Sequence, residues 1–305
     1  MTDNNQVFVR EVGLRDGIQS LNTIATQDKL QWLKVESEAG VRAFEITSFV
    51  PAHVIPQFFD AQTMVEQGQL NPRLVLSALV LNEKGAMRAL EAGTKNIVFV
   101  LSASATHSQK NARTTLENAL AAVARLIEMV KQQPEPPHIT GAIATSFGCT
   151  YEGHIESKTV LNIADRMAQA GVDHIALGDT VGFAGPRQVR NLFTQLHQLL
   201  GKLPLGAHFH DTRGMGMANV LAALDAGVRH FDASLGGLGG CPFAPGATGN
   251  IATEDLCFLL EEYGLQTGID LEKLLEARRW LAHLLPDEPL QGALSRAGLP
   301  TIITH

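Results

Sequence analysis

The chain has 305 residues and a net charge of −7, from 24 Lys and Arg against 31 Asp and Glu. A protein that binds nucleic acid or an anionic membrane usually concentrates basic residues, so this balance argues against both kinds of partner. Hydrophobic residues make up 45% of the chain and charged residues 18%, which is typical of a globular protein and excludes a disordered one. The length is compatible with two ordinary domains or with one large barrel.

The three cysteines, Cys149, Cys241 and Cys257, are an odd number without a CxxC pair, so they do not indicate a disulfide framework. The first residues, MTDNNQVFVREVG, contain neither the basic nor the apolar segment of a secretory signal. No apolar run approaches the roughly 20 residues that a membrane-spanning helix needs. We therefore expect a soluble protein with reduced thiols, located in the cytoplasm.

Short runs of β-branched and apolar residues alternate with longer segments of helical period along most of the chain. This alternation indicates βα units and a parallel sheet. Eight strands are predicted, at residues 6–12, 42–47, 73–80, 96–101, 139–145, 174–177, 205–210 and 230–234. Because no linker interrupts these units, we predict an α/β protein in which residues 1–262 form a (β/α)8 TIM barrel, the catalytic domain.

Residues 263–305 are predicted to form a C-terminal helical extension that packs on the barrel. One helix is expected at residues 271–285, since Pro286 and Pro289 interrupt the helical pattern there.

Four of the predicted helices end in an Ala-Gly pair shortly before the next strand. The glycines are Gly40, Gly93, Gly171 and Gly227. Glycine is favoured just past a helix because it adopts the left-handed backbone conformation without strain. The repetition predicts the same helix-to-strand turn at several places around the barrel.

Polar residues gather at the predicted carboxyl ends of the strands, where barrels of this kind carry their active sites. They are Arg15, Asp16 and Gln19 after the first strand, Glu45 in the second, Asp179 after the sixth, His208 and His210 at the end of the seventh, and Cys241 and Asn250 after the eighth. These residues are the candidates for catalysis and metal binding.

His208 and His210 are two positions apart on a predicted strand, so their side chains point to the same side. Asp16 and Asn250 would add oxygen ligands from the first and last strands. Such a mixed set suits Mg²⁺ or Mn²⁺, and zinc is the less favoured alternative. Two other interpretations stay open, since Asp16 can be an ordinary turn residue beside Gly17 and Asn250 can cap a helix that starts at residue 251.

Two carboxylates admit more than one role. Glu45 is flanked by apolar residues on a predicted strand, and an unpaired buried carboxylate is costly, so we expect a partner such as Arg15 or a metal-bound water. Asp179 can be a base, a neighbour of the metal ligands, or a local turn residue.

The segment at residues 235–250 contains six glycines in sixteen residues. We interpret it as a mobile lid that carries Cys241 as an acid or base, against the alternative that this cysteine is incidental. The glycines here and in GMGMAN at residues 214–219 do not match the GxGxxG pattern of a dinucleotide-binding site.

Six segments occur in a characteristic order: EVGLRDGIQ at residues 11–19, FEITSFVPAHVIPQFFDA at 44–61, GCTYEG at 148–153, LGDTVG at 177–182, HFHDTRGMGMAN at 208–219 and GGCPFAPGATGNIATEDL at 239–256. Together they resemble the 3-hydroxy-3-methylglutaryl-CoA (HMG-CoA) lyase family of the metal-dependent DRE-TIM metallolyase superfamily. The resemblance covers residues 7–285. It implies a barrel enzyme that uses a divalent cation and takes an acyl-CoA thioester as its substrate.

The resemblance also implies a role for each matching residue. The implied metal ligands are Asp16, His208, His210 and Asn250. Arg15 falls on the residue that neutralises the thioester oxygen as an enolate develops, and Cys241 on a cysteine that transfers a proton. Glu45 and Asp179 match carboxylates around the metal, Gln19 joins Arg15 in binding substrate, and the substrate hydroxyl would lose its proton to His208 or Asp179.

The activity implied is the cleavage of HMG-CoA to acetoacetate and acetyl-CoA, a step of leucine degradation. The C-terminal extension on the barrel favours a homodimer. Departures from the family pattern at Leu81, Thr150 and Arg213 keep a second substrate open, citramalyl-CoA, which would give pyruvate and acetyl-CoA. A Claisen-type synthase is a further alternative, although we would expect it to carry an additional C-terminal regulatory region.

Overall fold

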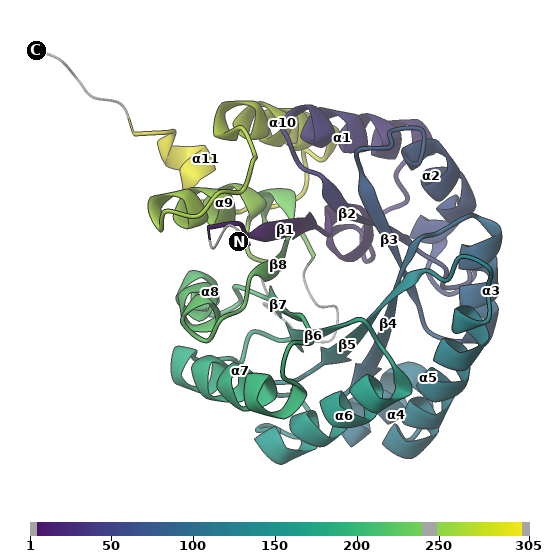
Figure 1. The fold of residues 1–305 in the computed structure, drawn as a ribbon. Helices are drawn as coiled ribbons and strands as arrows, with labels where there is room; N and C mark the ends of the chain where they lie inside the picture. The colour runs from purple at the N-terminus through teal and green to yellow at the C-terminus, as the bar shows by residue number, and fades with distance from the viewer. Residues whose placement is uncertain (1–4, 240–248, 301–305) are drawn as a thin grey trace, which may run out of the picture.

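The computed structural model describes residues 5–239 and 249–300. Eight parallel strands form a closed barrel in the order of the sequence, and helices surround it (Figure 1). Closure removes the exposed edges that an open sheet would present. The predicted (β/α)8 barrel is therefore confirmed. In the part of the chain that the structure describes, no helix is long and apolar enough to cross a membrane.

The strands lie within two residues of the predicted bounds. They are β1 (Phe8–Glu11), β2 (Ala43–Ser48), β3 (Val75–Val80), β4 (Asn96–Ser102), β5 (His138–Ala144), β6 (His174–Asp179), β7 (Leu205–Phe209) and β8 (His230–Ala233). The helices are α1 (Thr26–Glu38), α2 (Ala61–Gly68), α3 (Glu83–Glu91), α4 (Ala105–Ala112), α5 (Leu116–Lys131), α6 (Ser157–Ala170), α7 (Pro186–Leu200), α8 (Gly216–Asp225), α9 (Thr253–Glu262), α10 (Leu271–Leu284) and α11 (Leu294–Ala297). Three short helical turns are η1 (Gly13–Gly17), η2 (Pro56–Phe58) and η3 (Leu235–Gly237).

The predicted glycine turns are present. Gly40, Gly93, Gly171 and Gly227 have φ angles of 104°, 80°, 98° and 94°, which residues with a side chain rarely adopt. At Gly40, space is a second constraint, because an added Cβ would lie 2.6 Å from the carbonyl oxygen of Gly268. These turns return the chain from the outer helices to the barrel.

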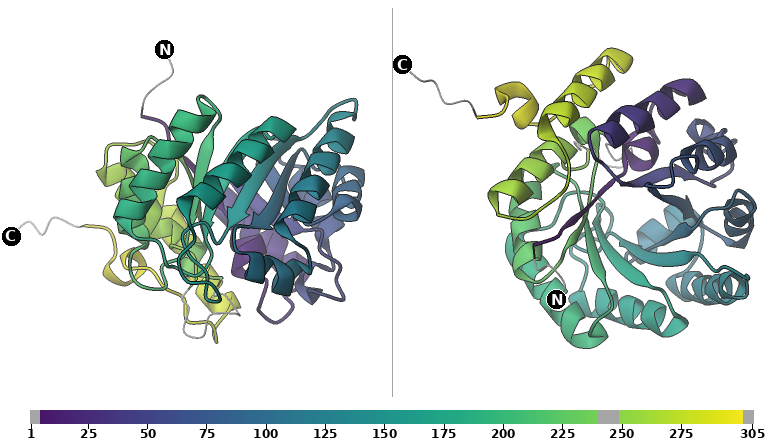
Figure 2. Two further views of the ribbon diagram at one scale, coloured as in Figure 1. Left: turned by 90° about the horizontal axis from the view of Figure 1, so that it is seen from below. Right: turned by 45° about the horizontal axis from the view of Figure 1, so that its top comes forward.

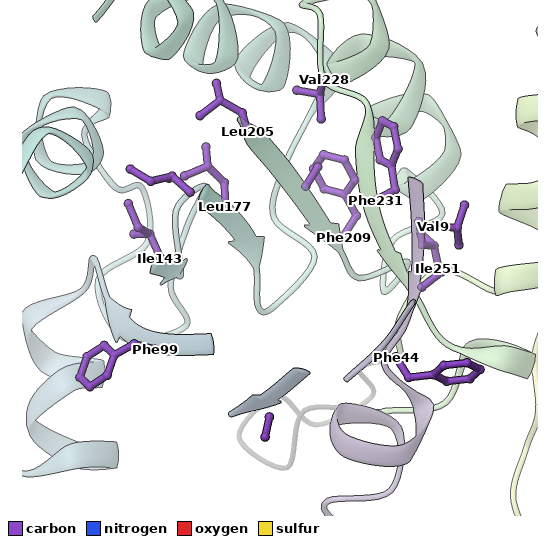
Figure 3. Close-up of a cluster of buried hydrophobic side chains, with 14 of the residues drawn as sticks. Val9, Phe44, Phe99, Ile143, Leu177, Leu205, Phe209, Val228, Phe231 and Ile251 are labelled. Carbon is purple, nitrogen blue, oxygen red and sulfur yellow. The ribbon is translucent and has the colours of Figure 1, made fainter. Parts of the chain in front are cut away.

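The hydrophobic core lies between the barrel and the helices. Phe44, Phe209 and Phe231 belong to this layer and are at most 1% exposed (Figure 3). Burying a side chain of this size contributes roughly 1.5 to 3 kcal/mol. Successive side chains on a strand point to opposite faces, so His208, the neighbour of Phe209, points into the barrel. The outer layer thus supplies much of the stability and leaves the barrel interior available for polar groups.

The C-terminal helices complete the outer wall where the barrel closes. Helix α10 packs against α1 and α9, and α11 packs against α9 (Figure 2). The Asp270 side chain caps α10 by accepting a hydrogen bond from the Lys273 amide. The helix ends at Leu284, one residue before the predicted end. The division of the chain into domains at residue 262 stays a prediction.

Candidate active site

The first part of the site is η1, a five-residue turn of π-helix directly after β1. Gly13, its first residue, has no room for a side chain, because an added Cβ would lie 2.6 Å from Oε1 of Glu11. The amide of Asp16 donates to the carbonyl of Val12 at 2.7 Å, which keeps the turn tight. Two consecutive residues, Arg15 and Asp16, are thereby fixed at the carboxyl end of the barrel.

The second part of the site lies at the end of β7. The Nε2 atoms of His208 and His210 are 3.2 Å apart. His210 also forms an isolated β-bridge with Asn250, and the amide of the next residue, Ile251, donates to the carbonyl of Phe209 at 3.1 Å. The backbone pairing therefore brings the candidate ligands from β7 and from the segment after β8 together.

Asp16 faces both histidines. Its Oδ2 atom lies 3.5 Å from Nε2 of His210 and 3.9 Å from Nε2 of His208, and these three side chains form a cluster that could hold a metal ion. Three atoms with these spacings can all lie about 2.1 Å from one common point, which is the usual length of a metal–nitrogen or metal–oxygen bond. The residues therefore fit a divalent cation.

Asn250 completes the set that was predicted to bind metal. Its Nδ2 donates to Oδ2 of Asp16 and to the carbonyl of Leu238, both at 2.8 Å. Its Oδ1 is buried and has no hydrogen-bond partner among the described residues, so it is available to a cation. The alternative role as a helix cap is wrong, because α9 starts at Thr253 and Ala252 occupies the capping position.

Arg15 links Asp16 to Glu45. Its Nη1 lies 2.5 Å from Oδ1 of Asp16, while Nε and Nη2 lie 2.6 Å and 2.5 Å from Oε2 of Glu45. The expected pairing of Glu45 with Arg15 is therefore present, and it compensates for a carboxylate that is fully buried. Burial alone would raise the pKa of Asp16, but the Arg15 guanidinium and the two histidines lower it well below its usual range. Asp16 is therefore an anion at neutral pH, as a metal ligand must be.

Comparison with known proteins identifies the family. The family model described as HMGL-like matches residues 6–281. The chain belongs to the HMGL-like family. The resemblance inferred from the sequence motifs is thus confirmed, and the family is one of enzymes.

Individual relatives of this HMGL-like chain are HMG-CoA lyases by name. Hydroxymethylglutaryl-CoA lyase YngG of Bacillus subtilis is 38% identical, over 90% of this chain and 92% of its own. The mitochondrial hydroxymethylglutaryl-CoA lyase of Homo sapiens is 36% identical, over 92% of this chain and 86% of its own. The solved structure of an HMG-CoA lyase from A. baumannii, in complex with coenzyme A and 3-methylmalate, is 38% identical and has a TM-score of 0.93, covering 100% of this chain and 99% of that one.

The remaining predicted residues of the HMGL-like site lie in different surroundings. Gln19 adjoins the candidate ligands, since its Nε2 donates to Oδ1 of Asp16 at 3.1 Å. Asp179 accepts the amides of Phe183 and Ala184 with its two carboxylate oxygens, at 2.8 Å and 3.1 Å. These contacts organise the loop after β6, as a local turn residue would, and burial raises the pKa of Asp179.

Cys241 and most of the glycine-rich segment predicted as a lid lie outside the described residues. Cys149 and Cys257 are both buried and free of disulfide bonds.

Two residues that the sequence did not single out also belong to this part of the HMGL-like barrel. Nδ1 of His208 lies 3.2 Å from Oδ2 of Asp232, and Asp232 pairs with Arg10. Both come from strand interiors, Asp232 from β8 and Arg10 from β1. The sequence signal for both is a charged residue at an inward position within a strand, away from the strand ends where the other candidates lie.

Proposed function

We propose that the protein is a divalent-metal-dependent carbon–carbon lyase that cleaves HMG-CoA to acetoacetate and acetyl-CoA. One observation carries this proposal: three candidate metal ligands lie next to the guanidinium of Arg15. Oδ2 of Asp16 faces the Nε2 atoms of His208 and His210, while the other oxygen of the same carboxylate binds Arg15. A cation site and a fixed positive charge are therefore adjacent, as the cleavage of a 3-hydroxyacyl thioester requires.

Asp16, His208, His210 and Asn250 would hold the cation. When bound there, a divalent cation makes a hydroxyl group of the substrate more acidic. The rest of the chemistry belongs to the protein. The C3 hydroxyl loses its proton to Asp179, because His208 would have no free lone pair with its Nε2 on the cation and its Nδ1–H on Asp232. C3 becomes a carbonyl carbon, and the bond between C2 and C3 breaks. The electron pair of that bond forms an enolate on the thioester, and a proton added at C2 completes acetyl-CoA.

We assign to Arg15 the stabilisation of the enolate oxygen. A guanidinium has five N–H groups, and three of those in Arg15 are directed at Asp16 and Glu45. The others remain for a substrate oxygen. The negative charge on that oxygen develops only as the bond breaks, so an interaction with it lowers the barrier without tightening substrate binding equally. Cys241 is the proton donor in the sequence-based interpretation and stays a prediction.

Partly exposed residues lie on the barrel strands that precede β7. Val100 of β4, Ala142 of β5 and Gly178 of β6 are small and partly exposed, and Gly178 pairs in register with His208. The A. baumannii relative binds coenzyme A together with 3-methylmalate, a hydroxy acid. Both facts support an acyl-CoA thioester with a hydroxyl and a carboxylate near the reacting carbon as the substrate of this chain.

The test is a direct assay of the purified protein with Mg²⁺ or Mn²⁺ and a thiol reductant. HMG-CoA should yield acetoacetate and acetyl-CoA in equal amounts, and stripping the cation with EDTA should abolish the reaction. Citramalyl-CoA is the comparison substrate, with pyruvate as the product to measure. A larger kcat/KM for citramalyl-CoA than for HMG-CoA would show that citramalyl-CoA is the substrate. Full activity in EDTA would overturn the metal dependence.

The same proposal includes the finer properties that were expected from the sequence. We propose Mg²⁺ or Mn²⁺ as the ion, a homodimer as the assembly, and leucine degradation in the cytoplasm as the setting. The donor set of two imidazoles with carboxylate and amide oxygens supports the choice of ion. Sedimentation of a stable monomer at assay concentration would exclude the dimer, and a higher kcat with zinc than with Mg²⁺ or Mn²⁺ would exclude the choice of ion.

A further inference from the structure

Three polar side chains lie side by side in the barrel interior, one each from β1, β8 and β7. The strand register pairs Arg10 with Asp232, and Asp232 with His208. Side chains at paired positions of neighbouring parallel strands point to the same face of the sheet. Since His208 points into the barrel, Arg10 and Asp232 do as well. The three residues form one row across the place where the first and last strands meet.

Arg10 holds Asp232 through two hydrogen bonds. Its Nε donates to Oδ1 at 2.9 Å and its Nη2 donates to Oδ2 at 2.7 Å. Paired bonds between a guanidinium and a carboxylate fix the plane and orientation of the carboxylate, which a single bond does not. Oδ2 of Asp232 also lies 3.2 Å from Nδ1 of His208. The orientation imposed by Arg10 is therefore passed on to the imidazole.

The contact with Asp232 determines which nitrogen of His208 carries the hydrogen. A carboxylate held by a guanidinium only accepts hydrogen bonds, so Nδ1–H of His208 donates to Oδ2 of Asp232. The Nε2 atom is then without hydrogen, and it lies 3.2 Å from Nε2 of His210. Metal-binding histidines generally donate their second ring nitrogen to a carboxylate or carbonyl in this manner.

We propose that Arg10 is a positioning residue of the metal site, although it contacts none of the candidate ligands directly. Arg10 clamps Asp232, and Asp232 holds His208 in the tautomer and ring orientation that present Nε2 to the cation. This inference rests on the proposed function, since it assumes that Asp16, His208 and His210 bind a divalent cation.

The competing explanation is that Arg10 and Asp232 only fill the barrel interior. The neighbouring floor of the barrel is filled by aromatic rings that, among the described residues, form no hydrogen bond with the candidate ligands. The rings of His174 and His230 lie 5.0 Å apart, and Phe8 stacks on His230 at 4.7 Å. Residues that only fill space affect stability and not the affinity for a cation. Metal affinity measured separately from stability therefore distinguishes the two explanations.

The experiment measures Mn²⁺ binding to metal-stripped protein by titration calorimetry, and the melting temperature of the same samples. The variants are Arg10→Gln, Arg10→Lys and Asp232→Asn, with His174→Gln as the matched control in the barrel floor. We expect Arg10→Gln and Asp232→Asn to weaken Mn²⁺ binding by about 10- to 100-fold, the range known for partners of metal-binding histidines. Arg10→Lys keeps the charge but loses the paired bonds, so it should weaken binding by an intermediate factor.

The control decides the interpretation. His174→Gln should change Mn²⁺ affinity by less than about twofold, even if its melting temperature falls, because nothing in the floor orients His208. Wild-type Mn²⁺ affinity in Arg10→Gln would overturn the inference, and if that variant does not fold, wild-type affinity in Arg10→Lys would do so. Absence of Mn²⁺ binding in the wild-type protein would overturn the metal site itself, and with it both proposals. If the wild-type protein binds Mn²⁺ and Asp16→Asn does not, the metal site is established. Wild-type affinity in the Arg10 variants would then contradict only the positioning role of Arg10.

Discussion

The side chains of His208 and His210 face each other through Nε2 atoms that lie 3.2 Å apart. Nε2 atoms this close direct either two lone pairs at each other or one N–H at a lone pair when no cation lies between them. A cation between them, with Oδ2 of Asp16 completing the set, satisfies all three groups at once. The histidine pair therefore predicts that the protein is more stable with a divalent cation than without one.

Metal binding should raise the melting temperature. A ligand at about 100 times its Kd stabilises the native state by about 2.7 kcal/mol, which corresponds to several degrees for a protein of this size. Calorimetry of metal-stripped protein with and without Mn²⁺ measures the shift. In His210→Ala the shift should disappear. If Mn²⁺ raised the melting temperature of His210→Ala as much as that of the wild type, the stabilising ion would bind at a different site.

Replacement of Arg15 should slow the reaction and destabilise the protein. Arg15→Met should lower kcat by about 10²- to 10³-fold, the usual effect of losing a group that stabilises a developing oxyanion. The variant also leaves the buried carboxylate of Glu45 unpaired, so its melting temperature should fall.

The double variant Arg15→Met with Glu45→Gln removes that buried charge. It should regain part of the lost stability and remain as inactive as Arg15→Met. Recovery of activity together with stability would show that Arg15 acts only by neutralising Glu45.

Gly239 should be essential for the metal site. It has a φ of 107°, and an added Cβ would lie 2.5 Å from Nδ2 of Asn250 and 3.0 Å from Oδ2 of Asp16. Gly239→Ala should therefore displace two candidate ligands and weaken Mn²⁺ binding at least about tenfold. The matched control is Gly264→Ala, where φ is 84° and no atom lies within 4 Å of the added Cβ.

Both glycine substitutions carry a backbone strain of about 1 to 2 kcal/mol, so both melting temperatures should fall. That of Gly239→Ala should fall further, because its added Cβ also displaces Asn250 and Asp16. Only Gly239→Ala should lose affinity for Mn²⁺. Equal affinity in the two variants would show that Asn250 and Asp16 do not bind the ion together.

A buried pair of carboxyl groups should make stability depend on pH. Glu11 accepts hydrogen bonds from the Gly13 and Leu235 amides and from the Thr253 hydroxyl. Glu36 of α1 adjoins Glu11, and both side chains are fully buried. Burial, together with the charge of Glu11, raises the pKa of Glu36 well above the 4.5 of an exposed glutamate.

Because the folded state keeps a proton on this pair that the unfolded state releases above pH 4.5, the free energy of unfolding should fall as the pH rises from there. One such proton changes that free energy by about 1.4 kcal/mol per pH unit. Glu36→Gln should flatten the dependence and melt at a higher temperature than the wild type at pH 8. The exposed Glu38→Gln on the same helix is the control, and a wild-type pH profile in Glu36→Gln would contradict the prediction.

The barrel was predictable because its signals are local. Each strand is a short apolar run, and glycines such as Gly171 mark turns that need a left-handed backbone. The residues at the strand ends could be found in the same way, since the carboxyl ends of parallel strands meet at one face. Strand-end position alone is accordingly enough to group Asp16, His208, His210 and Asn250.

The row of Arg10, Asp232 and His208 was not predictable by that method. It depends on the register between β1, β8 and β7, which pairs residues 222 positions apart in the chain. Local patterns carry no information about such pairing. The role of Asn250 was ambiguous for a related reason, because only the position where α9 begins, at Thr253, distinguishes a ligand from a helix cap.

The hydrogen bond from Asn250 to Asp16 spans 234 positions of the sequence. Contacts of such high sequence separation form late, after the entropy of closing a long loop has been overcome. A chain that is still being synthesised has β1 and η1 but lacks β7, β8 and Asn250, so it cannot assemble the site. Affinity for the cation therefore reports the docking of the last strand against the first, and Mn²⁺ can serve as a probe of complete folding.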